Sequence, residues 1–156
     1  MKFIDAPARA GEAFEIGTTI RDAETVAHFQ KSGWRLSNPD RISLEHDQYV
    51  DFIRASKGEF TVAKDQYVRL RTGWFSDRSA CYLAAGRPVI TQETGFTRLY
   101  GGGRGLLAFT TMEEIVEAVR TINADYAAHS RAAFAIAAEY FEATKVVASL
   151  LDRAGV

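Results

Sequence analysis

The sequence is poor in residues that cross-link or interrupt a chain. Its 156 residues include one cysteine, Cys81, and three prolines. A single cysteine excludes an internal disulfide and a zinc site built from several cysteines. Three prolines without an internal repeat exclude collagen-like and solenoid architectures. The sequence also lacks any apolar run close to the roughly 20 residues of a membrane-spanning helix, so we expect no membrane span.

Length and composition fit one folded domain. Hydrophobic residues make up 47% of the chain and charged residues 25%, which argues against extended disorder. We expect residues 1–156 to form a single domain that buries a sufficient core without a structural metal. The first ten residues carry charges and no apolar stretch, so we expect no signal peptide and a soluble, cytoplasmic protein.

Charge is unevenly distributed along the chain. The formal net charge of −1 argues against binding to nucleic acid. Residues 64–104, however, hold seven basic and three acidic residues, a net charge of +4, whereas the remainder carries −5. A basic middle in an acidic protein indicates a small anionic ligand. Chance placement of solvated arginines is the alternative interpretation.

Hydrophobic patterning predicts alternating strands and helices. Strands are expected at residues 13–20, 34–36, 59–63, 88–91 and 106–109, with either a short strand or a frayed lead-in at residues 3–4. Helices are expected at residues 23–31, 43–58, 76–85, 112–122, 125–140 and 144–152, with loops at 65–75 and 94–105. This order predicts an α/β domain with a mainly parallel sheet, helices on both faces and C-terminal helices that close it. Ligands of such sheets bind beyond the carboxyl ends of the strands.

The segment from Gly73 to Ser79 is the clearest candidate site. A loop there meets a helix that Ser76 or Asp77 begins. Free amides at a helix start bind anions, and an arginine such as Arg78 can hold a phosphate through two parallel hydrogen bonds. Ser76 and Ser79 add hydroxyl donors, and we expect Arg78→Ala to weaken binding with little effect on stability. The alternative is an ordinary capped helix start with Asp77 in its first turn and Arg78 in solvent.

Two loops add residues to this site. Lys64 and Arg71 lie in the loop that leads to the helix, and Thr94, Gly95 and Phe96 follow the strand at 88–91. A glycine there lets the backbone approach a ligand closely. We expect the neighbouring pair of aromatic residues, Trp74 and Phe75, to anchor the loop rather than to stack on a base. The glycines at 101–103 match no complete phosphate-binding motif.

No catalytic set is evident. The three histidines, His28, His46 and His129, are far apart and are expected in solvent, and no histidine pair has metal-ligand spacing. Ser76 and Ser79 have no evident base, so a serine hydrolase is unsupported. Cys81 is expected to be a small buried side chain rather than a nucleophile. We therefore name no catalytic residue and expect neither a metal nor a cofactor.

Residues 81–90, CYLAAGRPVI, resemble the donor-side signature of GT-B glycosyltransferases. That signature reads Glu-Ala-apolar-Ala-x-Gly-x-Pro-Val in many retaining members. Ala84, Gly86, Pro88 and Val89 match it, and Leu83 takes the apolar place. A wider stretch, about residues 30–152, is similar to the C-terminal half of bacterial group 1-like glycosyltransferases. Cys81 stands where the family has a glutamate that often binds ribose, so ribose recognition must differ or be lost.

The resemblance implies a Rossmann-like three-layer domain that binds the nucleotide half of a nucleotide-diphosphate sugar, for example a UDP sugar, as donor for hexosyl transfer. The residues it implies for binding are Ser76, Asp77, Arg78, Ser79, Thr94, Gly95 and Phe96, to which the basic loop before the helix adds Lys64 and Arg71. GT-B enzymes also use an N-terminal acceptor domain. We therefore expect this chain to need such a domain or a partner chain, and to dimerise or aggregate when isolated. A non-catalytic nucleotide-binding or protein-interaction module is the alternative, whereas another small α/β enzyme is disfavoured because no catalytic set is evident.

Overall fold

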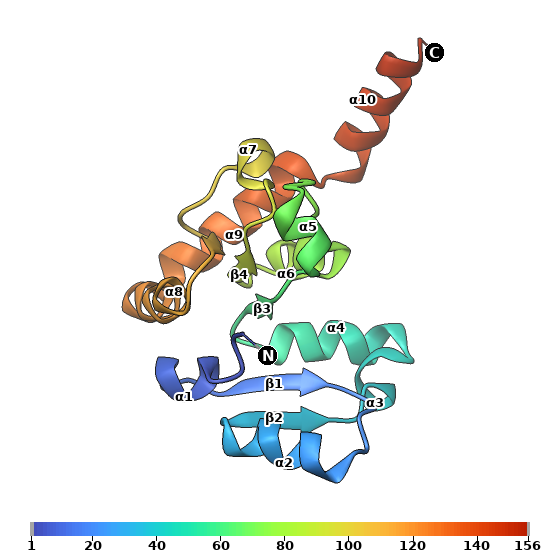
Figure 1. Cartoon of the computed structure of the whole chain (residues 1–156). Helices are drawn as coiled ribbons and strands as arrows, with labels where there is room; N and C mark the ends of the chain where they lie inside the picture. Colours follow the sequence, from blue (N-terminus) through green and yellow to red (C-terminus); the bar gives the residue numbers. More distant parts are fainter. Residues whose placement is uncertain (1, 156) are drawn as a thin grey trace.

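The computed structural model describes residues 2–155, in which helices alternate with parallel strands (Figure 1). In chain order the elements are α1 (Ala6–Ala10), β1 (Phe14–Gly17), α2 (Ala23–Lys31), β2 (Trp34–Ser37), α3 (Asp40–Ser43), α4 (His46–Ala55), β3 (Glu59–Thr61), α5 (Asp65–Arg69), α6 (Asp77–Ala84), β4 (Val89–Gln92), α7 (Thr97–Tyr100), β5 (Leu106–Phe109), α8 (Met112–Ala124), α9 (Tyr126–Tyr140) and α10 (Ala143–Ala154). The predicted α/β class and Rossmann-like arrangement are confirmed.

The central sheet has the order β3-β4-β5, and both of its pairings are parallel. Glu59 pairs with Val89, and Val89 pairs with Leu106. All four residues of β4 are buried, as expected for a strand covered on both faces. Parallel pairing aligns the strand ends, so the loops after β3 and β4 leave from the same edge of the sheet.

Two apolar cores cover the two faces of this sheet. Side chains alternate along a strand, and Val89 and Ile90 accordingly belong to opposite cores. On one face, Ile90 and Phe109 pack with α1 and with the buried side of α8. On the other, Val89 and Leu106 pack with residues of α4, α6 and α9. The result is the three-layer arrangement that the alternating pattern predicts.

A second, two-stranded sheet pairs β1 with β2 in parallel. It lies with α2, α3 and α4 in the lower half of Figure 1. Aromatic contacts join it to the central sheet, because the Phe14 ring lies 5.0 Å from that of Phe60 and the Trp34 ring 6.1 Å from it. Among the described residues β1 and β3 share no hydrogen-bonded ladder, so the two sheets are separate.

Several local predictions are wrong. Residues 3–4 form a turn before α1, and Phe3 is buried in the core. The expected loop at 65–75 begins with α5, in which Asp65 and Arg69 form an ion pair one turn apart. The expected loop at 94–105 contains α7. Ser43 ends α3 instead of capping a longer helix, because Asn38 and Pro39 already start a turn in which the Asn38 side chain accepts from the amide of Asp40.

Helices α8 and α9 pack on the sheet as predicted, whereas α10 does not help to close the domain. Thr111 and Glu114 form the expected capping box at the start of α8. Helix α10 has no buried residue and extends away from the rest of the chain (Figure 1). Across residues 2–155, helices long and apolar enough to cross a bilayer are absent.

Candidate functional site

Helix α6 begins at the carboxyl edge of the central sheet, where the site is expected. Ser76 occupies the N-cap in an extended conformation, but its hydroxyl makes no capping bond. Instead it donates to Oδ1 of Asp77 at 3.4 Å. The same Oδ1 accepts from the backbone amide of Arg78 at 2.8 Å. Asp77 therefore already occupies one of the helix-start amides that an anion would use.

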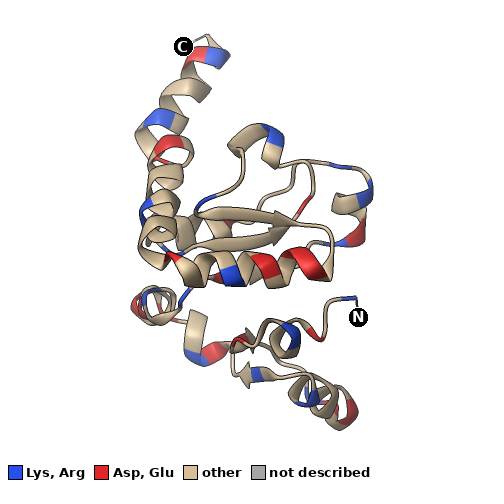
Figure 2. Ribbon diagram, turned by 90° about the vertical axis from the view of Figure 1, so that its left-hand side faces the viewer, with Lys and Arg blue, Asp and Glu red and all other residues tan. Residues whose placement is uncertain are grey.

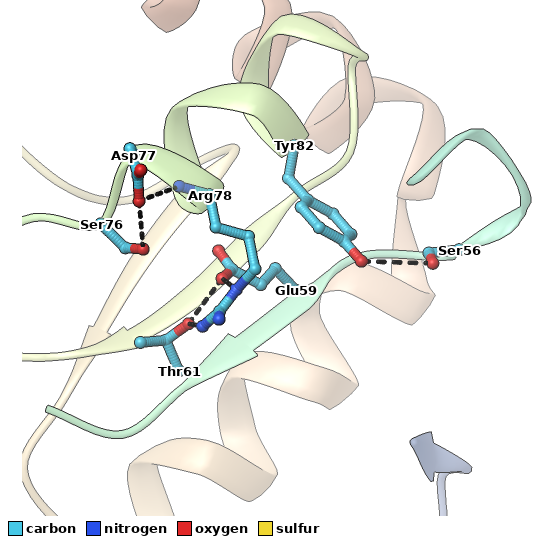
Figure 3. Close-up of polar contacts among 7 residues, drawn as sticks. All are labelled: Ser56, Glu59, Thr61, Ser76, Asp77, Arg78 and Tyr82. Carbon is cyan, nitrogen blue, oxygen red and sulfur yellow. Dashed lines mark hydrogen bonds and ion pairs between the residues drawn. The ribbon is translucent and has the colours of Figure 1, made fainter. Parts of the chain in front are cut away.

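Arg78 is held by an internal network (Figure 3). Its Nε donates to Oε1 of Glu59 at 2.6 Å, and its Nη2 donates to the hydroxyl of Thr61 at 3.0 Å. The Thr61 hydroxyl in turn donates to the same Glu59 oxygen at 2.7 Å. The Glu59 side chain is only 4% exposed, whereas that of Arg78 is 49% exposed. Arg78 is thus not simply in solvent, as the alternative interpretation supposed.

The electrostatics follow from this contrast in burial. Burial acts to lower the pKa of Arg78, but the charge of Glu59 and its hydrogen bond outweigh it and raise that pKa. Arg78 therefore stays charged. A guanidinium has five N–H donors, of which Glu59 and Thr61 use two. The remaining donors leave Arg78 able to meet a ligand.

The loop that leads into α6 is hydrogen-bonded to the loop that follows β4. The amide of Gly73 donates to the Thr94 carbonyl at 2.8 Å, and the Thr94 hydroxyl donates to the Trp74 carbonyl at 2.6 Å. Gly95 has φ +101°, and a Cβ there would lie 2.9 Å from the Arg71 carbonyl oxygen. Gly95 is thus required for this close approach. The structure brings the two predicted segments together.

The predicted site residues differ in how much of them a ligand can reach. Lys64 and Arg71 are exposed, and Arg71 lies 3.4 Å from the carboxylate of Glu93. Arg71 also has a left-handed backbone, with φ 47°, in a region that residues other than glycine seldom adopt. The side chains of Ser79, Thr94 and Phe96 are fully buried. Phe96 packs on Phe75, so the expected anchoring role of Phe75 is confirmed.

Trp74 also anchors the loop, because its ring stacks on Tyr67 of α5 at 5.1 Å. The basic excess of residues 64–104 is partly neutralised. Arg69, Arg71 and Arg78 each pair with an acidic side chain. Lys64, Arg98 and Arg104 form no ion pair within residues 2–155. Charges of both signs are interspersed along the ribbon in Figure 2.

A cavity of about 850 Å³ is lined by residues of both sheets. Residues 12–17, which include β1, and residues 58–62, which include β3, form two of its walls. Aromatic side chains line it together with the polar network: Trp34, Tyr49, Phe52, Phe60, Tyr82, Glu59, Thr61 and Arg78. Burial raises the pKa values of Tyr49 and Tyr82, which keeps both phenols neutral. Tyr82 and Ser56 share a long hydrogen bond of 3.4 Å at its margin (Figure 3).

Two expectations about reactive side chains are wrong. Cys81 is exposed and lies in the cavity wall, because the buried face of α6 is formed by Ser79, Tyr82 and Leu83. His129 is buried rather than solvated, and its Nδ1 accepts from the amide of Gly105 at 3.2 Å. Burial, with a smaller contribution from Arg104, lowers the pKa of His129. His129 therefore supports the β5 loop as a neutral ring.

Sequence reasoning missed Glu59 and Thr61 as members of this site. The alternation in the strand at 59–63 was the available signal, because it puts Phe60 and Val62 on one side and thereby Glu59 and Thr61 on the other. The cation that pairs with Glu59 depends on how α6 packs against β3. The local sequence pattern does not determine that packing.

Among the described residues, no three His, Cys, Asp or Glu side chains are grouped to hold a metal ion. A guanidinium, helix-start amides, a buried carboxylate and an aromatic-lined cavity can together recognise an anionic, hydroxylated ligand.

A search of curated proteins finds no match. A family model described as glycosyl transferase-like matches residues 5–151. Because that match spans nearly the whole chain, the protein belongs to the glycosyl transferase-like family, as a GT-B group 1-like glycosyltransferase domain.

Proposed function

We propose that this chain is a donor-binding domain, which takes a nucleotide-diphosphate sugar such as a UDP sugar for hexosyl transfer. The observation that carries the proposal is the joining of the two loops at the carboxyl edge of the sheet. The hydrogen bonds of Thr94 with Gly73 and Trp74 hold these two loops together. Arg71 and the start of α6 therefore lie at the same edge of the sheet. Open α/β sheets bind their ligands at this edge.

The diphosphate is assigned to Arg78 and the helix-start segment Ser76–Ser79. The donors of Arg78 that Glu59 and Thr61 leave free suit phosphate oxygens. Lys64 or Arg71 supplies a second positive charge, and the Thr94–Phe96 backbone lines the same edge. The helix dipole of α6 adds roughly 0.3–1 kcal/mol of attraction for an anion. We assign no metal and no cofactor to the reaction.

Titration calorimetry tests this assignment. The chain is titrated with UDP, with GDP and with their hexose conjugates, and we expect saturable binding of at least one of them in the micromolar to millimolar range. Inorganic sulfate is the control for charge alone. A chain that binds no nucleotide diphosphate at millimolar concentration would sink the proposed function.

We further propose that the domain needs an N-terminal acceptor domain or a partner chain for transfer. Large apolar side chains are exposed in segments that follow β1, β2, β3 and β4: Ile20, Leu44, Val62, Leu70 and Leu99. Others lie on α10: Val146, Val147, Leu150 and Leu151. The four on α10 gather on one helix, and an apolar surface of that kind is typical of an interface, so in the isolated chain it favours dimers or aggregates. The bacterial, cytoplasmic setting expected in the sequence analysis stays a prediction.

A non-catalytic nucleotide-binding or protein-interaction module is the second candidate. Cys81 favours it, because its exposed thiol stands in the cavity wall where the resembling enzymes carry a glutamate. Hexosyl transfer measured after addition of an acceptor-domain partner distinguishes the two. The second candidate predicts nucleotide binding without transfer.

A further inference from the structure

We propose that Glu59 accepts a hydrogen bond from a hydroxyl group of the bound donor, in the cavity between β1 and β3. This inference rests on the proposed function and names a residue that determines which ligand the site takes. Glu59 is not among the residues that the sequence points to. It reaches the cavity wall because it is the first residue of β3, beside α6.

The hydrogen bonds of the Glu59 carboxylate are unevenly shared. Oε1 accepts from both Arg78 and Thr61. Oε2 is buried and has no hydrogen-bond partner within the described chain. Native proteins leave few buried polar atoms unpaired, and each one calls for an explanation. An acceptor in a cavity wall with an unused oxygen is suited to a ligand that brings an O–H or N–H donor.

The local charge favours an uncharged hydrogen-bond donor opposite Oε2 of Glu59. Arg78 and Glu59 together carry no net charge, so their pair attracts a ligand ammonium only weakly. A phosphate oxygen has no proton to give at neutral pH, and the carboxylate repels it. A ligand hydroxyl can donate a hydrogen bond to the unpaired Oε2. Because the hydroxyl is uncharged, its burial avoids the desolvation cost of a charged group.

The cavity suits a hydroxylated ring. Its volume of about 850 Å³ lies within the range of small-molecule sites, which span roughly 300–1,000 Å³. Trp34, Tyr49 and Tyr82 give it aromatic walls for the apolar faces of a ring. Cys81 in the same wall has a short side chain without a carboxylate. Glu12, Glu15 and Asp77 also line the cavity, but Glu59 is the carboxylate that pairs with the Arg78 guanidinium.

Access to Oε2 requires a neighbour to move, because the atom has no exposed surface. Arg78, which holds the other oxygen of the same carboxylate, is the neighbour whose movement this proposal requires, since it is half-exposed on a flexible stem while Glu59 is fixed in a strand. A phosphate that draws the guanidinium outward opens Oε2 to the hydroxyl. The hydroxyl then replaces part of the hydrogen bonding that the carboxylate loses.

The test compares ligands with and without hydroxyls on one protein. Calorimetry gives the affinity of the chain for the tighter of UDP and GDP, for its 2′,3′-dideoxy form, and for its glucose conjugate. A lost hydrogen bond to a charged acceptor weakens binding by about tenfold to a hundredfold. If the dideoxy form binds more weakly by that factor, Glu59 contacts the ribose hydroxyls. If the glucose conjugate instead binds more tightly by that factor, Glu59 contacts the hexose hydroxyls.

Variants connect the effect to Glu59. In Glu59→Gln the ligand hydroxyls should no longer change the affinity, whereas the control Glu117→Gln, which alters an exposed ion pair on α8, should keep the full difference. If thermal unfolding shows that the Glu59→Gln variant does not fold, Glu59→Asp takes its place. Aspartate keeps the negative charge, but its shorter side chain holds the carboxylate farther from the ligand. This inference is overturned if the wild type binds ligands with and without hydroxyls equally well, or if the Glu59 variant still distinguishes them. Either result leaves the proposed function intact. Failure of every nucleotide to bind overturns both.

Discussion

Arg78 and Glu59 join the first turn of α6 to the first residue of β3, with 2.6 Å between Nε and Oε1. The pair is unequal, because the carboxylate is buried and the guanidinium is half-exposed. Loss of the cation therefore leaves a buried charge without its partner. The structure accordingly changes what the Arg78→Ala variant is expected to do.

Arg78→Ala should lower the free energy of unfolding by about 1–3 kcal/mol, less than for a fully buried pair because water reaches the site. This reverses the expectation from sequence, in which stability was nearly unaffected. Urea unfolding measures the change. Arg120→Ala, which breaks an exposed pair with Glu117, is the matched control and should leave the midpoint nearly unchanged. Equal midpoints for the two variants would show that the Glu59 pair contributes nothing.

Gly105→Ala should destabilise the fold by about 2 kcal/mol or more. Gly105 has φ +83°, and a Cβ there would lie 2.4 Å from the backbone nitrogen of Ala133 in α9. Gly11→Ala is the control, because Gly11 has φ +63° but nothing within 4 Å of the added carbon. It carries only the backbone strain of about 1 kcal/mol. Thermal unfolding of both variants measures the two losses of stability. Equal losses would contradict the close contact between the start of β5 and α9.

His129 should make stability fall as the pH drops below 6.5, its ordinary pKa. Because folding lowers this pKa, the unfolded chain binds the proton more readily, and acid shifts the equilibrium toward unfolding. The neutral ring is also the form that accepts from Gly105. Urea midpoints between pH 7.5 and 5 measure the slope, and His129→Gln should remove most of it. A wild-type midpoint that is flat over this range refutes the prediction.

The isolated chain should associate as its concentration rises, because α10 exposes Val147 and Leu150 among other apolar side chains. Replacing both with serine should shift the chain toward the monomer in sedimentation velocity. Thr144→Ser and Ser149→Ala together serve as the control on the same helix. A wild-type chain that remains monomeric at high concentration would argue against the proposed partner surface.

The elements of the central sheet could be predicted from sequence because their signals are local. The apolar run at 106–109 and the capping box of Thr111 and Glu114 each specify structure within a few residues. The Arg78–Glu59 pair could not be predicted in this way, since its members lie 19 residues apart and meet only through packing. Cys81 was misplaced for a related reason, because the orientation of a short helix is set by its neighbours.

The most direct test of the account is a nuclear magnetic resonance titration of the ¹⁵N-labelled chain with UDP and with GDP. We expect the amide signals of residues 76–79 and 94–96 to shift in a saturable manner, while those of α10 stay in place. Saturable shifts at the carboxyl edge of the central sheet would show that the nucleotide binds where α6 begins. Shifts confined to α10, or no shifts at millimolar nucleotide, would show that the nucleotide does not bind at this edge.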